Sequence, residues 1–557
     1  MARSEQRSPS TLEQSPYLSV FPDAEAHDTL RFMGRQPDDS ITKNLGREIC
    51  QRKGVNVLLA GAIGGLGTHY VITLEAITAA TGDLIGHEQV EAESKEQVLH
   101  SLGGAATRLR RTLGESIGSI QKYDRPLEIG TTSSLEALKA WSLSRVLNAE
   151  GKPGEAIPYA QRAVDLDPNF AMAYRGLAIY HMLIRERAKQ FQFIQKAFDL
   201  RERASEMEKL LIAGNYYGMV PRDLDKALET LELLNRTYPH DAVSHNELAS
   251  VYNSLGEYEK GAEQARESLR LMPSAPVYGV LETALFRMNR FAEAKQTIEQ
   301  AMARHFERNY HPQLFDIAFV TNDVAGMKQQ IAWDESQPGH RDHLDWQAGA
   351  AAFRGQMRLS RTFARSPAEE AMYRECQNAK DLAARISSAR NSGGIWSSSL
   401  AWALCGDDAR AQSAADVYAQ GQLPTDTIEN GCRIPTLRAA MALARNQPAH
   451  TIELLEPARR FGGACRCWPE YLRGLAYIKL KSAPQAMAEF QYILDHRGFQ
   501  PNWQPQAYLG LARAAALGGD YYKSRRAYQD LLAIWKDADR DLPAVIEAKS
   551  EFEKLPR

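Results

Sequence analysis

The first residues of this sequence whose types and spacing could support a chemical function are four glycines followed by a threonine. A phosphate-binding loop offers backbone amides and a hydroxyl to the anion, and it needs a strand before it and a helix after it. The segment after these glycines, 68–77, alternates with a period of two and predicts a strand. A phosphate loop starting at Gly61 requires Gly five positions later and Lys six positions later, and the sequence has neither. The sequence therefore predicts a hairpin turn with a bulge for Gly61, Gly64, Gly65, Gly67 and Thr68.

A second pattern, Gly114-Glu115-Ser116-Ile117-Gly118, matches the G-x-S-x-G of a nucleophile elbow. Such an elbow joins a strand to a helix, because the turn must lift the serine out of the sheet. Here a predicted helix, 97–113, comes first. We therefore expect Gly114 to be the residue that ends this helix in a left-handed conformation.

A third pattern, His340-Arg341-Asp342, matches the H-R-D of a kinase catalytic loop. Leu344 stands where Lys is expected and Gln347 where Asn is expected. The sequence contains no Gly-rich ATP loop, no V-A-I-K lysine and no D-F-G. We therefore expect a charged loop between repeats, and a protein that is not an enzyme.

Metal ligation has little support, because the 13 histidines form no H-E-x-x-H and no second cysteine pair accompanies Cys465-Arg466-Cys467. The sequence favours plain thiols for the six cysteines, but leaves open a disulfide such as Cys405 with Cys432, and a metal site. Cys376 is likewise isolated. We expect no cofactor and no metal.

Composition describes an ordinary globular chain of 557 residues with 44% hydrophobic residues and a net charge of -2. The near-neutral charge and the lack of a polybasic run argue against nucleic acid as a partner. The N-terminus has no apolar core of a signal peptide, and no apolar run is long enough to span a membrane. As encoded, the chain is expected to be cytoplasmic without direct membrane insertion, or extracytoplasmic if a membrane helix precedes it in a longer product.

The first region, 15–125, predicts a small α+β domain with an antiparallel meander, after a disordered segment 1–14. Helical spacing is expected over 41–53, where Ser40 could cap the helix, and strands over 55–59, 70–76 and 84–92. Ser94 and Gln97 have the spacing of a capping box before the next helix.

After a linker, 126–134, the sequence repeats with a period of about 34 residues. Small residues, a turn glycine such as Gly256 and a helix-ending Pro273 recur at fixed offsets, and this pattern resembles tetratricopeptide repeats. The predicted fold is mostly α: a right-handed superhelix of helix pairs, a TPR α-solenoid, behind the α+β domain. Its expected parts are an array over 135–309, degenerate helical repeats over 310–465, C-terminal repeats over 466–540 and a capping helix over 541–557.

A wider resemblance covers most of the chain. The runs 47–52, 61–63, 69–72, 81–83, 94–99, 113–116, 131–138 and 165–171 are similar to the region between kinase and repeats in large bacterial serine/threonine protein kinases, of the kind abundant in acidobacteria. The resemblance implies a TolB N-terminal-like domain followed by TPRs. The kinase domain and membrane helix of that family are absent from this sequence, so no catalytic residue is carried over.

The sequence thus predicts a non-catalytic scaffold or sensor module that binds a peptide or partner protein, in a bacterial signalling context implied by the resemblance. The first helices of the repeats should line a concave face. The residues expected there are Trp141, Arg145, Arg175, Ile179, Asn246, Ser250 and Asn253. Two alternatives stay open: the regulatory region of a serine/threonine kinase, which would then be a partner, and a structural assembly subunit.

Overall fold

The fold is described here from a computed structural model of the 557-residue chain. The structure describes residues 12, 14–21, 26, 29–30, 32–35, 41–67, 69–126, 132–306, 309–339, 342–363, 400, 402–404, 408–420, 423–499 and 501–556. Several sequence predictions lie outside these residues: nearly all of the segment 1–14, the Ser40 cap, His340 and Arg341, and Cys376 and Cys405.

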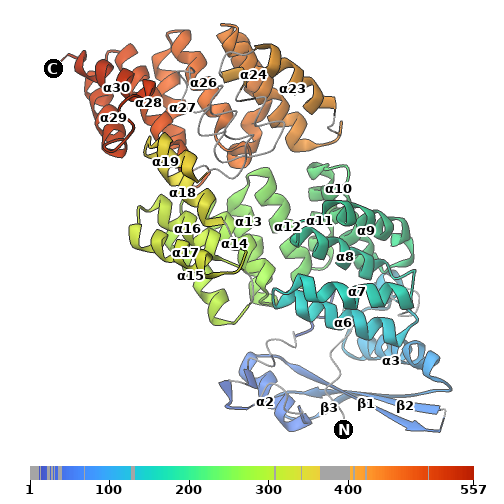
Figure 1. The fold of residues 1–557 in the computed structure, drawn as a ribbon. Coiled ribbons are helices and arrows are strands. Elements are labelled where there is room, and N and C mark those ends of the chain that lie inside the picture. Colours follow the sequence, from blue (N-terminus) through green and yellow to red (C-terminus); the bar gives the residue numbers. More distant parts are fainter. Residues whose placement is uncertain are drawn as a thin grey trace. The chain divides into compact units, whose positions relative to one another are not determined.

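Two compact units make up the chain. The first contains Met1–Tyr252, Lys260–Leu281 and Glu299–Arg308, and the second contains Asn253–Glu259, Glu282–Ile298 and Asn309–Arg557. The first unit holds a small sheet and the first helix pairs, the second holds the last pairs, and residues 242–303 are divided between the two. Figure 1 shows the sheet at the blue end of the chain and the helix pairs that follow.

The sheet is a three-stranded antiparallel meander in the order β1-β2-β3, as the sequence predicts. Its strands are β1 (Val57–Leu66), β2 (His69–Thr78) and β3 (Leu84–Ala92). The glycine run does not form the turn. Gly61 and Gly65 lie opposite Leu74 and Tyr70 in extended backbone, and only Gly67, with φ +65°, takes the left-handed conformation of the two-residue hairpin. The predicted bulge is also wrong for this hairpin, because β1 and β2 pair without a register shift.

Two helices pack on the sheet. The helix α2 (Lys43–Lys53) contacts β1, and its cap is Thr42, whose hydroxyl accepts from the Leu45 amide. The helix α3 (Val98–Thr112) contacts β2 and β3, where Ile72, Ala92 and Val98 form a small core. The predicted capping box at Ser94 is wrong: its hydroxyl makes no cap bond, and the Gln97 side chain accepts from the Glu93 amide instead.

The rest of the described chain is helical and consists mainly of antiparallel pairs, which confirms the predicted TPR-type α-solenoid fold behind an α+β domain. The first five pairs are α6 (Leu135–Ala149) with α7 (Pro153–Leu166), α8 (Ala171–Leu183) with α9 (Arg187–Leu200), α10 (Glu206–Met219) with α11 (Leu224–Thr237), α12 (Ala242–Leu255) with α13 (Tyr258–Leu271), and α14 (Ala275–Arg287) with α15 (Phe291–Ala303).

The later helices continue the same pattern. They are α16 (His311–Val320) with α17 (Val324–Ser336), α18 (Asp342–Phe353) with α19 (Met357–Thr362), α23 (Asp408–Gln420), α24 (Ile434–Ala444) with α25 (Pro448–Leu455), α26 (Trp468–Lys479) with α27 (Ala483–Asp495), α28 (Gln504–Leu517) with α29 (Tyr521–Ile534), and the terminal α30 (Pro543–Glu553). Gly256, at φ +86°, makes the turn between α12 and α13, as predicted.

Small residues let the helices of neighbouring pairs approach closely. Gly176 on α8 lies under the indole of Trp141, and an added Cβ there would overlap the ring. Gly474 and Gly510 accommodate the Phe490 ring in the same way. Glycine costs up to about 1 kcal/mol in a helix relative to alanine, so its use here reflects packing.

Within the second unit, the turns of three helix pairs contact loops about two hundred residues further along the chain. Gly256 meets the Phe461 carbonyl, Asn289 bonds the Asp495 carbonyl, and the Gly355 carbonyl accepts from the Asp539 amide at 3.1 Å. We call these contacts, together with those of Arg287 described below, the turn seam. Nearest-neighbour stacking, which the repeat pattern predicts, is therefore supplemented here by long-range contacts.

A disulfide also belongs to the second unit. Cys432 is bonded to Cys465, with the two Cα atoms 6.5 Å apart. The expectation of plain thiols is therefore wrong for these two cysteines, and so is the suggested pairing of Cys405 with Cys432. Cys432 and Cys465 are separated by 33 residues, about one repeat, which places them side by side just before α24 and α26. Cys50 and Cys467 are buried thiols that lie outside this disulfide.

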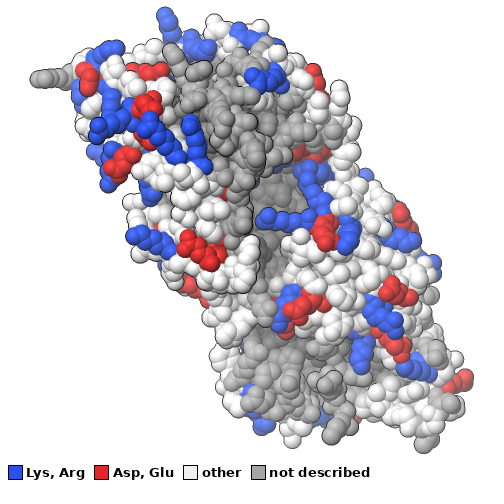
Figure 2. All heavy atoms as spheres, in the orientation of Figure 1, with Lys and Arg blue, Asp and Glu red and all other residues white. Residues whose placement is uncertain are grey.

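Charge is mixed on the surface. On the face drawn in Figure 2, the Lys and Arg side chains lie in small groups among the Asp and Glu side chains. This mixed pattern accords with the net charge of -2 and offers no track for a nucleic acid among the described residues of that face. In the described part of the chain, every helix is too short or too polar to cross a membrane.

Candidate functional site

The first helices of successive pairs form a layer of their own in the first unit. The helix α6 contacts α8, and α8 contacts α10, in addition to the contacts each makes with its paired helix. Polar side chains then reach from α8 to α12. We call the surface carried by α6, α8, α10 and α12 the first-helix face. It is the surface on which the sequence places the binding residues.

A closed polar cluster lies on this face. Arg175 on α8 donates through Nε to Asn215 Oδ1 and through Nη2 to Glu247 Oε1, both at 2.6 Å. Asn215 on α10 donates in turn to Glu247 Oε2 at 2.8 Å. Each of the three side chains therefore bonds the other two. The cluster fixes three successive first helices side by side, and charge-assisted bonds of this kind are among the stronger ones in proteins.

Tyr180 lies between two of the predicted binding arginines. Its ring is buried, and its hydroxyl lies 3.3 Å from Ser144 Oγ. Burial raises the pKa of Tyr180 to about 12, although the Ser144 hydrogen bond and the positive charges of Arg145 and Arg175 pull it down. Tyr180 is therefore neutral at physiological pH and serves as packing between α6 and α8. Arg145 is half-buried beside it.

The remaining predicted residues follow the exposed side of α8 and α12. Ile179, Asn246, Ser250 and Asn253 are all half-buried. Asn246 and Ser250 are one turn apart, and the Ser250 hydroxyl donates to the Asn246 backbone carbonyl at 2.9 Å. The side-chain oxygen of Asn246 accepts no hydrogen bond from the described residues, although it is buried from water. Such an acceptor costs free energy until a donor reaches it.

Trp141 and Arg175 do not have the surface role that the sequence suggests. Trp141 is only 2% exposed, packs edge-on against Phe170 and sits over Gly176. It is a core residue, so it cannot anchor a partner's side chain from this position. Arg175 lies on the predicted face, but it is 7% exposed and already bonded within the cluster. The sequence did not predict Asn215 and Glu247 as members of this face. Their role follows from their hydrogen bonds to Arg175, which join residues of different repeats.

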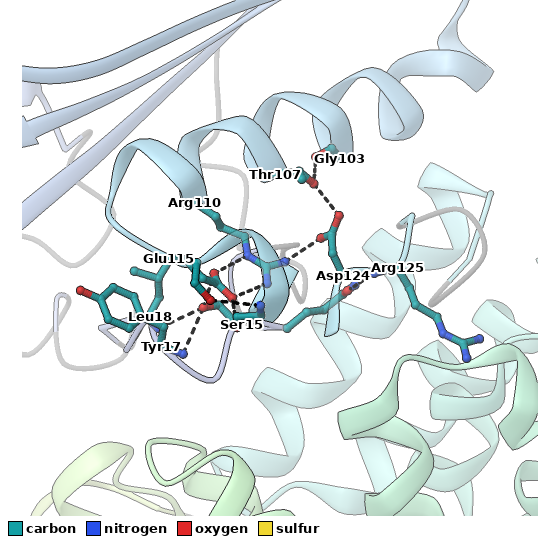
Figure 3. A network of polar contacts seen from close by, with 12 residues as sticks. Ser15, Tyr17, Leu18, Gly103, Thr107, Arg110, Glu115, Asp124 and Arg125 are labelled. Atoms are coloured by element: carbon teal, nitrogen blue, oxygen red, sulfur yellow. Dashed lines mark hydrogen bonds and ion pairs between the residues drawn. The ribbon is translucent and has the colours of Figure 1, made fainter. Parts of the chain in front are cut away.

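The G-x-S-x-G pattern has a structural explanation at the end of the α+β domain. Gly114 follows α3 with φ +99°, as expected for a helix end, and Ser116 caps α4 (Ile117–Tyr123) by accepting from the Ser119 amide. Glu115 belongs to a buried ion network drawn in Figure 3. The pattern therefore supplies a cap and a buried charge.

The network of Figure 3 centres on Arg110, which is fully buried on α3. Its Nε donates to Glu115 Oε2 at 2.8 Å and its Nη1 to Asp124 Oδ1 at 2.6 Å, while Ser15 also donates to Glu115. Burial by itself would raise the pKa of Glu115, but the hydrogen bonds from Arg110, Ser15 and Ser119 outweigh it and lower the pKa to about 2. The network ties residues near the N-terminus to the end of the domain.

The other chemical patterns also have structural roles. Asp342, the last residue of the H-R-D pattern, starts α18, and the next residue, His343, joins α18 to α17 by donating from its backbone amide to Asp334 at 2.9 Å. In the glycine run, Gly61, Gly64 and Gly65 lie in strand β1, and Gly67 follows it in the turn. Among the described residues, no group of three or more His, Cys, Asp or Glu side chains is placed to hold a metal ion.

Comparisons with known proteins add little. No family model matches the chain, and no curated protein matches it. Among solved structures, MamA residues 41–end from Desulfovibrio magneticus RS-1 aligns at 18% identity over 32% of this chain and 98% of that one, with a TM-score of 0.20. The APC/C hetero-tetramer Cut9–Hcn1 aligns at 14% identity over 75% of this chain and 83% of that one, with a TM-score of 0.39. The fold assignment therefore rests on the helix pairs of this chain.

Proposed function

We propose that this chain is a non-catalytic scaffold whose first-helix face holds an extended segment of a partner protein. Two kinds of feature support the proposal. The fold presents first helices side by side, which is how helical repeats make extended binding surfaces. The side chains on that surface are hydrogen-bond donors and acceptors and one aliphatic contact, which suit a peptide backbone better than a small molecule.

The observation that carries the proposal is the side-chain oxygen of Asn246. It is removed from water and accepts no hydrogen bond from the described residues, whereas the neighbouring Glu247 has both carboxylate oxygens bonded within the cluster. Because Asn246 is half-buried, a rotation of its side chain would bring this oxygen to the surface, where a backbone amide of a bound segment would supply the missing donor. Ser250 and Asn253 continue the polar row along α12, and Arg145 and Ile179 extend the surface toward α6 and α8.

Peptides selected from a random display library against the full chain would test this proposal. Replacing both Asn246 and Ser250 by Ala removes two hydrogen-bonding side chains and should weaken the selected peptides by roughly tenfold or more. The matched control is Gln300→Ala, which removes an exposed amide on the second helix α15. Equal affinities for the double variant and the control would contradict the assignment of this face.

The kinase association is a narrower proposal. It rests on the resemblance of eight short runs between residues 47 and 171 to the segment that follows the kinase domain in large bacterial serine/threonine kinases. If the chain regulates such a kinase in signalling, the kinase or its substrate would supply the bound segment. Measuring autophosphorylation of a purified candidate kinase with and without the chain tests this, and no change in rate would exclude regulation of that kinase.

A further inference from the structure

In the part of the chain that the structure describes, β1 lies at an edge of the sheet and has none of the features that usually prevent edge pairing. Among the described residues its only strand partner is β2. Its sequence, VLLAGAIGGL, contains no charged residue and no proline over ten positions. Natural edge strands are usually short, charged, interrupted by proline or covered, because a bare edge offers a row of unpaired amides and carbonyls.

The opposite edge of the same sheet is different. The strand β3 carries His87, Glu88 and Glu91, and Glu88 is paired with Arg108 of the covering helix α3. Two copies of β3 placed side by side would bring carboxylates together, which disfavours pairing. The contrast between the two edges indicates that β3 is protected against pairing and β1 is not.

Part of β1 is covered on one face and part is exposed. Near its start, Leu58 packs against Gly46 of α2. Further along, Gly61–Gly65 is exposed and the Ile63 side chain is 51% exposed. No described atom lies within 4 Å of a Cβ built on Gly64. The face of the sheet is therefore uncovered by described atoms at this stretch of β1.

From these observations we infer that β1 pairs with β1 of a second copy of this chain, in antiparallel orientation, to make a continuous six-stranded sheet from two three-stranded ones. A second copy is the occupant that the charges favour. The strand has no charge or pocket that could select a foreign sequence, and its own uncharged sequence meets itself without repulsion. An antiparallel pairing of identical strands also closes under two-fold symmetry, and the outer edges that remain are the two charged β3 strands.

Sedimentation equilibrium of the full chain over a wide concentration range tests the inference. The wild type should reach twice the chain mass, and Gly64→Lys should weaken dimerisation at least tenfold, because it places like charges at the paired edge. Gly154→Lys is the matched control: it adds the same charge at another open glycine, on α7, and should leave the dimer intact.

Hydrogen exchange of β1 supplies an independent measurement if a variant folds poorly. In the wild type, β1 amides should become more protected as concentration rises, and Ile63→Lys should abolish that dependence. A wild type that stays monomeric, or a dimer that Gly64→Lys and Gly154→Lys affect equally, would overturn the inference. Peptide capture on the first-helix face does not depend on either result.

Discussion

Long-range contacts within the helical repeats are built differently in the two units. On the first-helix face of the first unit, side chains bond side chains across three successive first helices, as in Arg175, Asn215 and Glu247. In the turn seam of the second unit, side chains and glycines contact backbone. Arg287 donates to the carbonyls of Gly498 and Phe499, and a Cβ added at Gly498 would overlap the Phe286 carbonyl.

The first-helix face can change its hydrogen-bond partners when a segment binds, whereas the turn seam cannot. Side-chain groups can rearrange to meet a bound segment at modest cost, and Asn246 beside the cluster still has an acceptor to satisfy. Contacts between a glycine and a carbonyl oxygen admit no substitute, because any side chain fills the space that the opposing backbone occupies. We therefore assign recognition to the first-helix face and structural stabilisation to the turn seam.

The largest effect is expected at the seam glycine. Gly498→Ala forces the added methyl against the Phe286 backbone and should destabilise the second unit by about 3 kcal/mol. Hydrogen exchange of α14 and α27 under urea measures it. Gly154→Ala, at a glycine with no described atom within 4 Å of an added Cβ, is the control and should change stability by less than about 1 kcal/mol. A similar loss in both variants would show that the seam is not tightly packed.

A comparable loss of stability is expected in the first unit, at the fully buried ion pair between Arg110 and Glu115. Glu115→Gln removes one of the two carboxylates that pair with the buried Arg110 in the described part of the chain, which should cost about 3 kcal/mol in the protection of α3 against hydrogen exchange. Glu88→Gln is the control, because its pair with Arg108 on the same helix is partly exposed and should contribute at most about 1 kcal/mol.

The pH dependence of stability tests the same ion pair. The pKa of Glu115 is lowered from 4.5 to about 2, so its stabilisation is complete well above pH 4.5 and is lost as the pH falls toward 2. Between pH 7 and pH 3 the wild type should lose about 2 kcal/mol through this group, and Glu115→Gln should lack that part of the pH dependence. Parallel pH profiles of the two proteins would contradict the network of Figure 3.

Two arginines near the end of α14 should differ by a smaller amount in their contributions to stability. Arg287→Ala removes two bonds to carbonyls of the seam and should destabilise the second unit by about 2 kcal/mol. Arg290→Ala removes an exposed pair with Glu293 and should cost at most about 0.5 kcal/mol. Urea titration followed by circular dichroism measures both. Equal losses would mean that the seam contacts contribute no more than a surface ion pair.

Features set by local periodicity could be predicted from the sequence. The three strands, the helix-ending Gly114 and the turn at Gly256 follow from alternation, helix spacing and the need for a positive φ. The turn predicted for Gly61, Gly64 and Gly65 is wrong, because glycine also suits a strand where a large side chain lies over it, as Tyr70 does over Gly65. Composition does not distinguish those two uses.

Contacts between distant residues could not be predicted. Arg175 and Glu247 are 72 residues apart, and Arg287 and Gly498 are 211 apart, so no local pattern joins them. The burial of Trp141 depends on Gly176 in the next repeat, and the consensus position of Trp141 does not reveal it. The disulfide had a usable signal: the spacing of 33 residues between Cys432 and Cys465 is close to one repeat.

The central claim is that a partner segment binds along the first helices, and a hydrogen-exchange footprint of a selected peptide on the full chain tests it most directly. We predict increased protection in α8, α10 and α12 when the peptide is bound, with little change in the second helices α7, α9 and α11. A footprint confined to those second helices, or to the sheet, would contradict the account.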